Sequence, residues 1–557
     1  MKRIPFLPRW QKQPFLIIAL AFLAGASAVQ LFQEAITSDD AQAQAKIMGL
    51  EFTDAEIDSL LPSLEGFRND YSSLRTNEIT NSLSPALYFQ PIPPDYENHT
   101  EQAPLSFSDQ GAVELPVDRE ALAYYSVHQL AALIRTKKIT SVELTRFFLE
   151  RLKKYDPILH CVISYTEDLA MEQAARADRE IAAGKYRGIL HGIPYGAKDL
   201  LAARNYKTTW GAMPYKEQSF DYDATVIRKL EEAGAVLTAK LTLGALARGD
   251  VWYGEKTRNP WDPSTGSSGS SAGSASSVSA GLLPFAIGTE TMGSIVSPST
   301  TCGVTGLRPT FGRVSRYGAM ALSWSMDKIG PICRSAEDCA AVFAAILGPD
   351  GKDLSVSDYP FNYQSEYVSN RRLRLGYDSS AFARQYPFKA QDSTALESLR
   401  SLGYELVPIE LPEMPDIRFI LSVEAAAAFD ELTRSGRDDL MVRQTQNAWP
   451  NAFRQARFIP AVEYIQANRL RSQLIVDMAK VFDEVDLYVH PSWASRSLRI
   501  TNFTGHPCIV VPNGFQENGR PTSISFTGKL FDEGTLIGVA QAFQNATGFD
   551  DEHPVLK

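Results

Sequence analysis

The sequence is poor in cysteine and has no excess of positive charge. Five cysteines are scattered through 557 residues, and no two of them stand as Cys-x-x-Cys. This spacing fits neither a disulfide framework nor a zinc site. Lysine and arginine number 55 against 65 aspartate and glutamate, whereas a generic nucleic-acid binder needs a basic surface. We therefore expect no metal, no cofactor and no nucleic-acid partner.

The chain also lacks internal repeats and the compositional bias of disordered or collagen-like proteins. Hydrophobic residues make up 44% of it and charged residues 22%, which are ordinary globular values. Length alone favours three or four domains of about 150 residues, although one large α/β enzyme can also occupy such a chain.

The first 33 residues differ in character from the rest. Lys2, Arg3, Arg9 and Lys12 precede a run without charge at residues 13–33, and small residues follow the apolar part at 25–28. This pattern predicts a signal peptide over residues 1–28, cleaved after Ala28, and an exported protein, periplasmic or extracellular. The uncharged run is also about long enough to span a bilayer, so a membrane anchor through residues 13–33 is the alternative.

Residues 29–118 are interpreted as an N-terminal extension without a functional motif, and residues 119–550 as the main domain. The extension contains one short helix near 53–61 and then a Ser/Asn/Pro-rich stretch. In the main domain helices and short apolar strands interleave, which predicts an α/β fold: a mixed β-sheet covered by helices on both faces. The region about 385–480 is predicted to be a variable helical insertion, without a sheet strand, that lines a substrate cleft.

Within the main domain the pattern predicts the following elements. Helices are expected at residues 126–135, 141–154, 166–183, 224–233, 336–347 and 536–546, and strands at 189–190, 235–241, 283–287, 485–489, 508–511 and 523–527.

One segment stands out by composition. Residues 264–281 contain nine serines and four glycines, which by itself is typical of a flexible linker. However, a buried-strand pattern follows at 282–287, and a second glycine-centred turn follows that strand at 288–294. Two hydroxyl-rich turns around one helix and one strand can bring distant serines into one pocket.

These segments resemble the amidase signature family of serine hydrolases. Residues 192–199 read Gly-Ile-Pro-Tyr-Gly-Ala-Lys-Asp, residues 268–274 read Ser-Gly-Ser-Ser-Ala-Gly-Ser, and residues 288–298 read Gly-Thr-Glu-Thr-Met-Gly-Ser-Ile-Val-Ser-Pro. Further blocks at 302–315, 505–508 and 528–533 follow in the family's order. The resemblance covers roughly residues 120–550 and implies an amidase that acts on a small-molecule amide other than a peptide bond.

The resemblance implies a Ser–Ser–Lys triad. Ser294 would be the nucleophile, Ser270 the bridging serine with a cis peptide bond, and Lys198 the base; Ser271 would be a hydrogen-bond support or a packed small residue. A serine hydroxyl is a weak nucleophile until its proton is removed, and lysine removes it only when neutral, which requires a lowered pKa. The oxyanion donors would be the backbone N–H groups of Thr291, Met292, Gly293 and Ser294.

Three positions depart from the family pattern. The usual Asp is Glu290, a Gly of the oxyanion turn is Met292, and the Arg after Ser-Ile is Val296. The acidic residue is longer and the arginine is absent, so Glu290 and Val296 together indicate a coordinated change of one ion pair of the family pattern. A bulky residue such as Met292 resists a positive φ, if the turn requires one there.

Three other interpretations remain open at this point. The string Gly269-Ser270-Ser271-Ala272-Gly273 matches the Gly-x-Ser-x-Gly elbow of an α/β-hydrolase, with Ser271 as nucleophile and His490 or His506 as its base. A second is the amidase subunit of a tRNA-dependent amidotransferase, which releases ammonia from glutamine. The third is a binding protein that keeps a catalytically weakened amidase fold.

Overall fold

The computed structural model describes residues 35–77, 79–365 and 372–556. The predicted signal or anchor segment therefore lies outside the described residues. Among the helices of the described ranges, none is both long and apolar enough to cross a membrane.

The chain divides into two compact units, the first ending at Ile79 and the second comprising Thr80–Lys557. The first unit contains α2 (Ser38–Met48) and α3 (Asp54–Leu74), and capping boxes at Thr37 and Thr53 open them. The helix expected near 53–61 is α3, which continues beyond that range to Leu74.

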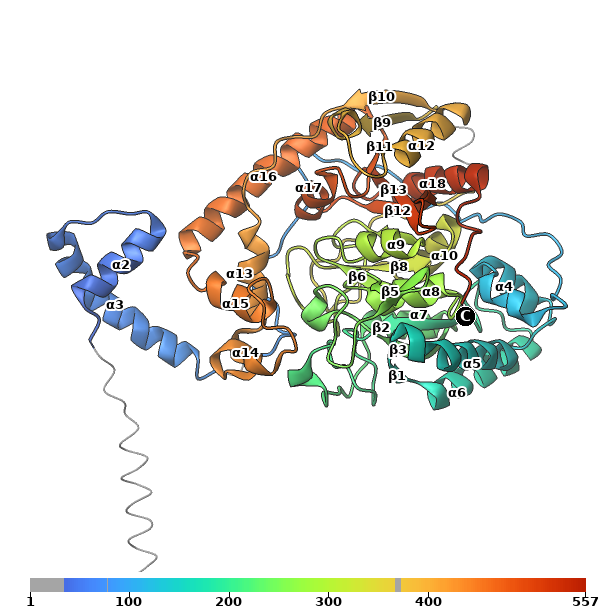
Figure 1. The fold of residues 1–557 in the computed structure, drawn as a ribbon, viewed down its shortest axis with the longest axis horizontal. Helices are drawn as coiled ribbons and strands as arrows, with labels where there is room; N and C mark the ends of the chain where they lie inside the picture. The colour runs from blue at the N-terminus through green and yellow to red at the C-terminus, as the bar shows by residue number, and fades with distance from the viewer. Residues whose placement is uncertain (1–34, 78, 366–371, 557) are drawn as a thin grey trace, which may run out of the picture. The chain divides into compact units, whose positions relative to one another are not determined.

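An 11-stranded mixed sheet forms the centre of the second unit (Figure 1), which confirms the predicted fold class. In sheet order the strands are β1 (Val162–Tyr165), β3 (Val236–Leu241), β2 (Pro194–Lys198), β6 (Phe285–Glu290), β8 (Lys328–Cys333), β7 (Thr305–Arg308), β12 (Cys508–Phe515), β13 (Pro521–Gly528), β11 (Leu487–Pro491), β9 (Arg374–Asp378) and β10 (Glu405–Ile409). The runs β3–β2–β6 and β11–β9–β10 are parallel, and the other neighbours are antiparallel. A separate two-stranded sheet pairs β4 (Arg258–Asn259) with β5 (Asp262–Gly266).

The helices of the second unit are α4 (Val127–Arg135), α5 (Ser141–Leu159), α6 (Glu167–Ala182), α7 (Thr225–Glu232), α8 (Ala272–Ser279), α9 (Val296–Cys302), α10 (Ala336–Ile346), α11 (Ser379–Ala383), α12 (Lys389–Ser401), α13 (Phe419–Ala428), α14 (Asp430–Arg434), α15 (Trp449–Ala456), α16 (Ala461–Glu484), α17 (Ser497–Thr504) and α18 (Glu533–Thr547). Of these, α5 to α12 and α18 make the main contacts with strands of the sheet. Every residue of β2, β3, β6 and β8 is buried. A strand with no exposed face needs cover on both sides, so even the charged residues within these strands, such as Lys198 and Lys240, are buried.

Two element predictions are wrong. Ile189 and Leu190 form no strand, because hydrogen bonds from His191 N–H to the Gly188 carbonyl and from Ile193 N–H to the Leu190 carbonyl close consecutive turns there. The region 385–480 does contain a sheet strand, β10, beside its helices. β10 lies at the sheet edge and is only partly buried, so it lacks the apolar run that marks an inner strand.

The sheet order explains how distant motifs meet. Strands β2 and β6 are parallel neighbours, so their carboxyl ends lie at the same edge of the sheet. Lys198 ends β2 and Glu290 ends β6, and α8, which follows the Gly/Ser-rich loop, contacts both strands. This edge therefore gathers Lys198, the loop before α8 and the turn after β6.

Candidate active site

Lys198 is fully buried and surrounded by hydroxyl groups. Its Nζ donates to Ser270 Oγ and Thr289 Oγ1, both at 2.8 Å, and to Ser271 Oγ at 3.1 Å. No carboxylate of the described residues lies within ion-pair distance of it. Burial therefore holds the pKa of Lys198 well below its usual value, although the charges of Asp327 and Glu290 oppose the shift.

The loop before α8 presents Ser270 and Ser271 to this amine. The Gly269–Ser270 peptide bond is cis, as the resemblance implies, and both serines are completely buried. Ser271 Oγ accepts hydrogen bonds from Lys198 Nζ and from Thr289 N–H and donates one to the Thr289 carbonyl, each at 3.1 Å. Ser271 thus joins the loop to β6 through hydrogen bonds.

Ser294 lies in the turn after β6 and is partly exposed. Its carbonyl oxygen accepts a hydrogen bond of 3.1 Å from Ser271 N–H, which brings the two serine-bearing segments together. Its Oγ forms no hydrogen bond with any described residue. The structure thus joins Lys198 to Ser270 directly. The segments that carry Ser270 and Ser294 are joined by the backbone hydrogen bond from Ser271, without a side-chain hydrogen bond between the two serines.

The turn that carries Ser294 has free backbone donors. The N–H groups of Met292, Gly293 and Ser294 donate to no acceptor in the described part of the chain. The positive φ falls on Gly293, at +103°, and Met292 has none. The substitution at Met292 therefore costs no backbone strain, and its side chain packs against a hydrophobic cluster that includes Met326.

Glu290 organises this turn through hydrogen bonds to its backbone. Its Oε2 accepts from the N–H groups of Ile295 and Val296 at 2.8 and 2.9 Å, and its Oε1 accepts from Arg308 Nη1 and Asn502 Nδ2, both at 2.8 Å. Burial raises the pKa of Glu290, but the Arg308 charge and these hydrogen bonds outweigh it and hold the pKa below its usual value.

The ion pair of Glu290 is therefore made with Arg308. The Val296 side chain faces apolar neighbours instead, namely Cys508, Val510 and Leu498.

Asp199, the residue after Lys198, forms a buried ion pair that sequence analysis missed. Its Oδ1 lies 2.8 Å from Lys240 Nζ on β3, and both side chains are fully buried. Its Oδ2 accepts from Thr209 N–H and Oγ1 at 2.8 and 2.6 Å. The adjacent Lys198 and Asp199 at the end of β2 are the only sequence feature that could have indicated this ion pair. The position of Lys240 opposite Asp199 depends on the sheet register, which the sequence does not give.

The structure gives no support to the histidine of the elbow interpretation. His490 Nε2 is 3.1 Å from Thr527 Oγ1, and His506 Nδ1 is 2.8 Å from Thr504 Oγ1. Burial lowers the pKa of His490 to about 4 and that of His506 to about 3. Neither imidazole is hydrogen-bonded to Ser271, whose hydroxyl partners are Lys198 and Thr289.

Comparison with known proteins places this geometry in context. A protein-family model described as Amidase matches residues 143–504. The chain is 32% identical over 480 residues to a glutamyl-tRNA(Gln) amidotransferase subunit from Roseiflexus castenholzii, an alignment covering 78% of this chain and 98% of that protein. It is equally 32% identical, over 478 residues, to a putative amidase AmiD from Mycobacterium bovis, with 80% and 98% covered.

Among solved structures, the peptide amidase from Stenotrophomonas maltophilia superposes with a TM-score of 0.68 at 30% identity. The superposition covers 76% of this chain and 97% of that one.

Gly293→Ala tests the turn geometry. A Cβ at Gly293 would lie 3.1 Å from Ser297 Oγ and 3.2 Å from Leu498 Cδ2, at a φ of +103° that L-residues rarely adopt. The turn must shift, so we expect kcat to fall at least about 100-fold, as when an oxyanion donor is lost. Gly403→Ala is the matched control, because it has a φ of +89° with no atom within 4 Å of the added Cβ. An equal loss of kcat in both variants would contradict the prediction.

Asp199→Ala tests the buried ion pair. Removing the carboxylate leaves the Lys240 charge buried without a partner, so the free energy of unfolding should fall by about 3–5 kcal/mol, measured by denaturant unfolding. The double variant Asp199→Ala/Lys240→Met removes the isolated charge and should recover part of this loss. No recovery would mean that the contacts with Thr209, and not the ion pair, carry the stability.

Proposed function

The chain belongs to the amidase signature family, and on that premise we propose that it hydrolyses a linear carboxylic amide to an acid and ammonia or an amine through an acyl-enzyme at Ser294. The observation that carries this proposal is the buried Lys198 amine, which has hydroxyl and carbonyl partners only and donates to Ser270 Oγ at 2.8 Å. A lysine with a sufficiently lowered pKa is neutral near physiological pH and can accept a proton.

The proposed reaction runs through both serines. Neutral Lys198 takes the proton of Ser270 while Ser270 takes that of Ser294, and Ser294 Oγ bonds to the amide carbon. The N–H groups of the 291–294 turn bind the resulting oxyanion. The C–N bond then breaks as the proton returns through Ser270 to the leaving nitrogen, and water releases the acid by the same relay.

A second candidate is glutamine hydrolysis for an amidotransferase. It is favoured by the 32% identity to the glutamyl-tRNA(Gln) amidotransferase component from Roseiflexus castenholzii. The basic and then apolar N-terminus favours the first candidate, since it predicts export away from tRNA. Glutamine-dependent ammonia release together with co-purification of partner subunits would select the second candidate.

Export is itself a proposal, based on the sequence of residues 1–33. Expression of the full chain should yield a mature protein that begins at residue 29 in the exported fraction, as determined by N-terminal sequencing. An intact N-terminus in the membrane fraction would select the anchor, and an intact chain in the cytoplasm would contradict both.

A fluorophosphonate that reacts with activated serines tests the nucleophile. The wild-type chain should be labelled, Ser294→Ala should not, and Lys198→Met should be labelled at least about 100-fold more slowly, because the relay lacks its base. Ser274→Ala is a suitable control, since Ser274 is a buried serine on α8 that donates to the Ile287 carbonyl and forms no hydrogen bond with Lys198. Labelling of Ser294→Ala at the wild-type rate would refute the assignment.

The pH profile tests the base. Because burial lowers the pKa of Lys198, the neutral form accumulates at a lower pH than for a free lysine. The labelling rate should therefore rise with pH and level off below the ordinary lysine pKa of about 10.4. Lys198→Met should lack this rise, and a flat wild-type profile over about pH 6–9 would contradict a lysine base.

A further inference from the structure

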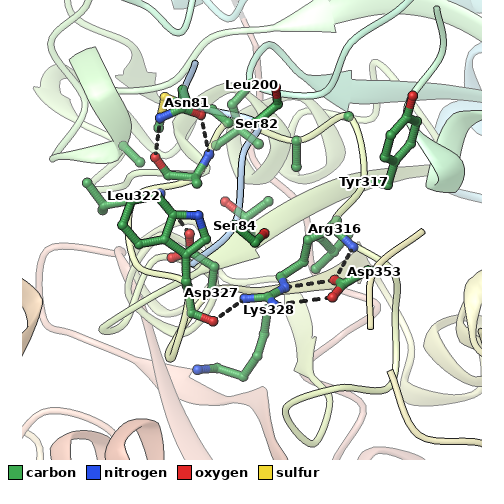
Figure 2. Close-up of a pocket in the computed structure, with 18 of the residues that line it drawn as sticks. Asn81, Ser82, Ser84, Leu200, Arg316, Tyr317, Leu322, Asp327, Lys328 and Asp353 are labelled. Carbon is green, nitrogen blue, oxygen red and sulfur yellow. Dashed lines mark hydrogen bonds and ion pairs between the residues drawn. The ribbon is translucent and has the colours of Figure 1, made fainter. Parts of the chain in front are cut away.

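A cavity opens beside the proposed active site in the second unit. It has a volume of about 220 Å³, and Figure 2 shows 18 of the residues that line it. Two of these belong to the site: Thr289, whose Oγ1 accepts from Lys198, and Thr291, the first residue of the turn that carries Ser294. The cavity thus lies beside the threonine that binds Lys198 and beside the first residue of the turn that carries Ser294, although Ser294 itself does not line it.

Part of the cavity wall comes from outside the region that matches the family model. Asn81, Ser82 and Ser84 line it, whereas the match begins at residue 143. We call residues 81–84 the strap. Leu83, between the two serines, does not line the cavity and is 62% exposed. Ser82 and Ser84 are exposed as well, so the strap forms an exposed edge of the cavity to which Leu83 does not contribute.

Asn81 anchors the strap. Its Oδ1 accepts from Ala321 N–H at 2.8 Å, and its Nδ2 donates to the Ala321 carbonyl at 2.9 Å and to the Ala428 carbonyl at 3.3 Å. One amide side chain thus satisfies both backbone groups of Ala321 and reaches the end of α13. This fixes the strap against the loop over residues 319–327.

The same loop is linked to the proposed oxyanion turn. Asp327 Oδ2 accepts from the N–H groups of Leu322 and Ser323 at 2.8 and 2.9 Å, and its Oδ1 accepts from Thr291 Oγ1 at 2.5 Å. The path from Asn81 to Thr291 is therefore an unbroken series of hydrogen bonds and short loop segments. Strap, loop and turn form one wall.

The cavity wall combines apolar, hydroxyl and charged groups. Arg316, its largest cation, is neutralised by Asp353, with Nε 3.0 Å from Oδ2. Leu200, Met320, Tyr317 and other apolar or aromatic residues also line the cavity, together with the charged side chains of Asp327, Lys328 and Lys352. Ser84 Oγ has no hydrogen bond to any described residue, so its hydroxyl is available to a bound group.

We propose that the strap is a specificity element that limits the size of the substrate substituent held in this cavity, with Ser84 at the contact surface and Asn81 as its positioning residue. The inference rests on the proposed amide hydrolysis at Ser294. It assigns a role to a segment in which the sequence shows no functional motif.

Two fluorophosphonates that differ only in their alkyl chain, methyl in one and decyl in the other, test the strap without knowledge of the substrate. The readout is the ratio of the decyl to the methyl labelling rate at Ser294. Ser84→Phe fills the cavity and should lower this ratio at least about tenfold, the scale on which pockets discriminate by size. Leu83→Phe adds the same ring at a strap position that does not line the cavity. It should leave the ratio of the two labelling rates within about twofold of wild type.

Asn81→Ala provides an independent readout, since it removes the hydrogen bonds that hold the strap against the 319–327 loop and does not fill the cavity. It should raise the same ratio, in the opposite direction to Ser84→Phe. If Ser84→Phe and Asn81→Ala both keep the wild-type ratio while the wild type is labelled normally, the strap is not a specificity element and the proposed function survives. If the wild type is labelled by neither probe, the proposed function itself is refuted, and the inference with it.

Discussion

A lysine amine held out of water among hydroxyl groups is the feature on which the proposed chemistry depends. Burial penalises the charged ammonium, and a carboxylate within ion-pair distance would cancel that penalty. The nearby acids are each engaged elsewhere: Asp199 with Lys240, Glu290 with Arg308, and Asp327 with Thr291 and two backbone N–H groups. The buried polar network thus serves stability and also keeps Lys198 without an acidic partner.

The turn after β6 shows how departures from a family pattern can be accommodated. Gly293 takes the positive φ, so the residue before it can be methionine. Glu290 has the reach to bind two N–H groups of the following segment while keeping Arg308 and Asn502 as partners. Val296 then packs among apolar side chains. These three positions therefore change the packing around the turn and leave its backbone donors free, which favours an active enzyme over a binding protein with a weakened site.

Residues 80–118, which follow the first unit and precede the helices of the second, have their own contacts with the rest of the second unit. Besides Asn81, Gln102 donates to the Phe361 carbonyl, and the Phe89 ring lies against the buried Arg471 guanidinium, 3.6 Å from ring centroid to Cζ. Irregular chain of this kind leaves no periodic signal, and its fixed position comes from individual side-chain contacts. The role of such a segment therefore depends on which part of the fold it contacts.

The sequence by itself was sufficient for the fold class, the family and most helices, because helical periodicity, capping residues such as Thr140 and Glu143, and the order of the Gly/Ser-rich blocks are local properties of the chain. It also indicated Lys198, Ser270 and Ser294 as the candidate catalytic residues. Only the tertiary structure showed that the nearby acids pair with other residues and not with Lys198. It alone showed that Gly293 and not Met292 takes the positive φ, and that Asn81, Ser82 and Ser84 line the cavity. Each of these depends on sheet register and on contacts between segments far apart in the chain, and no local pattern encodes such contacts.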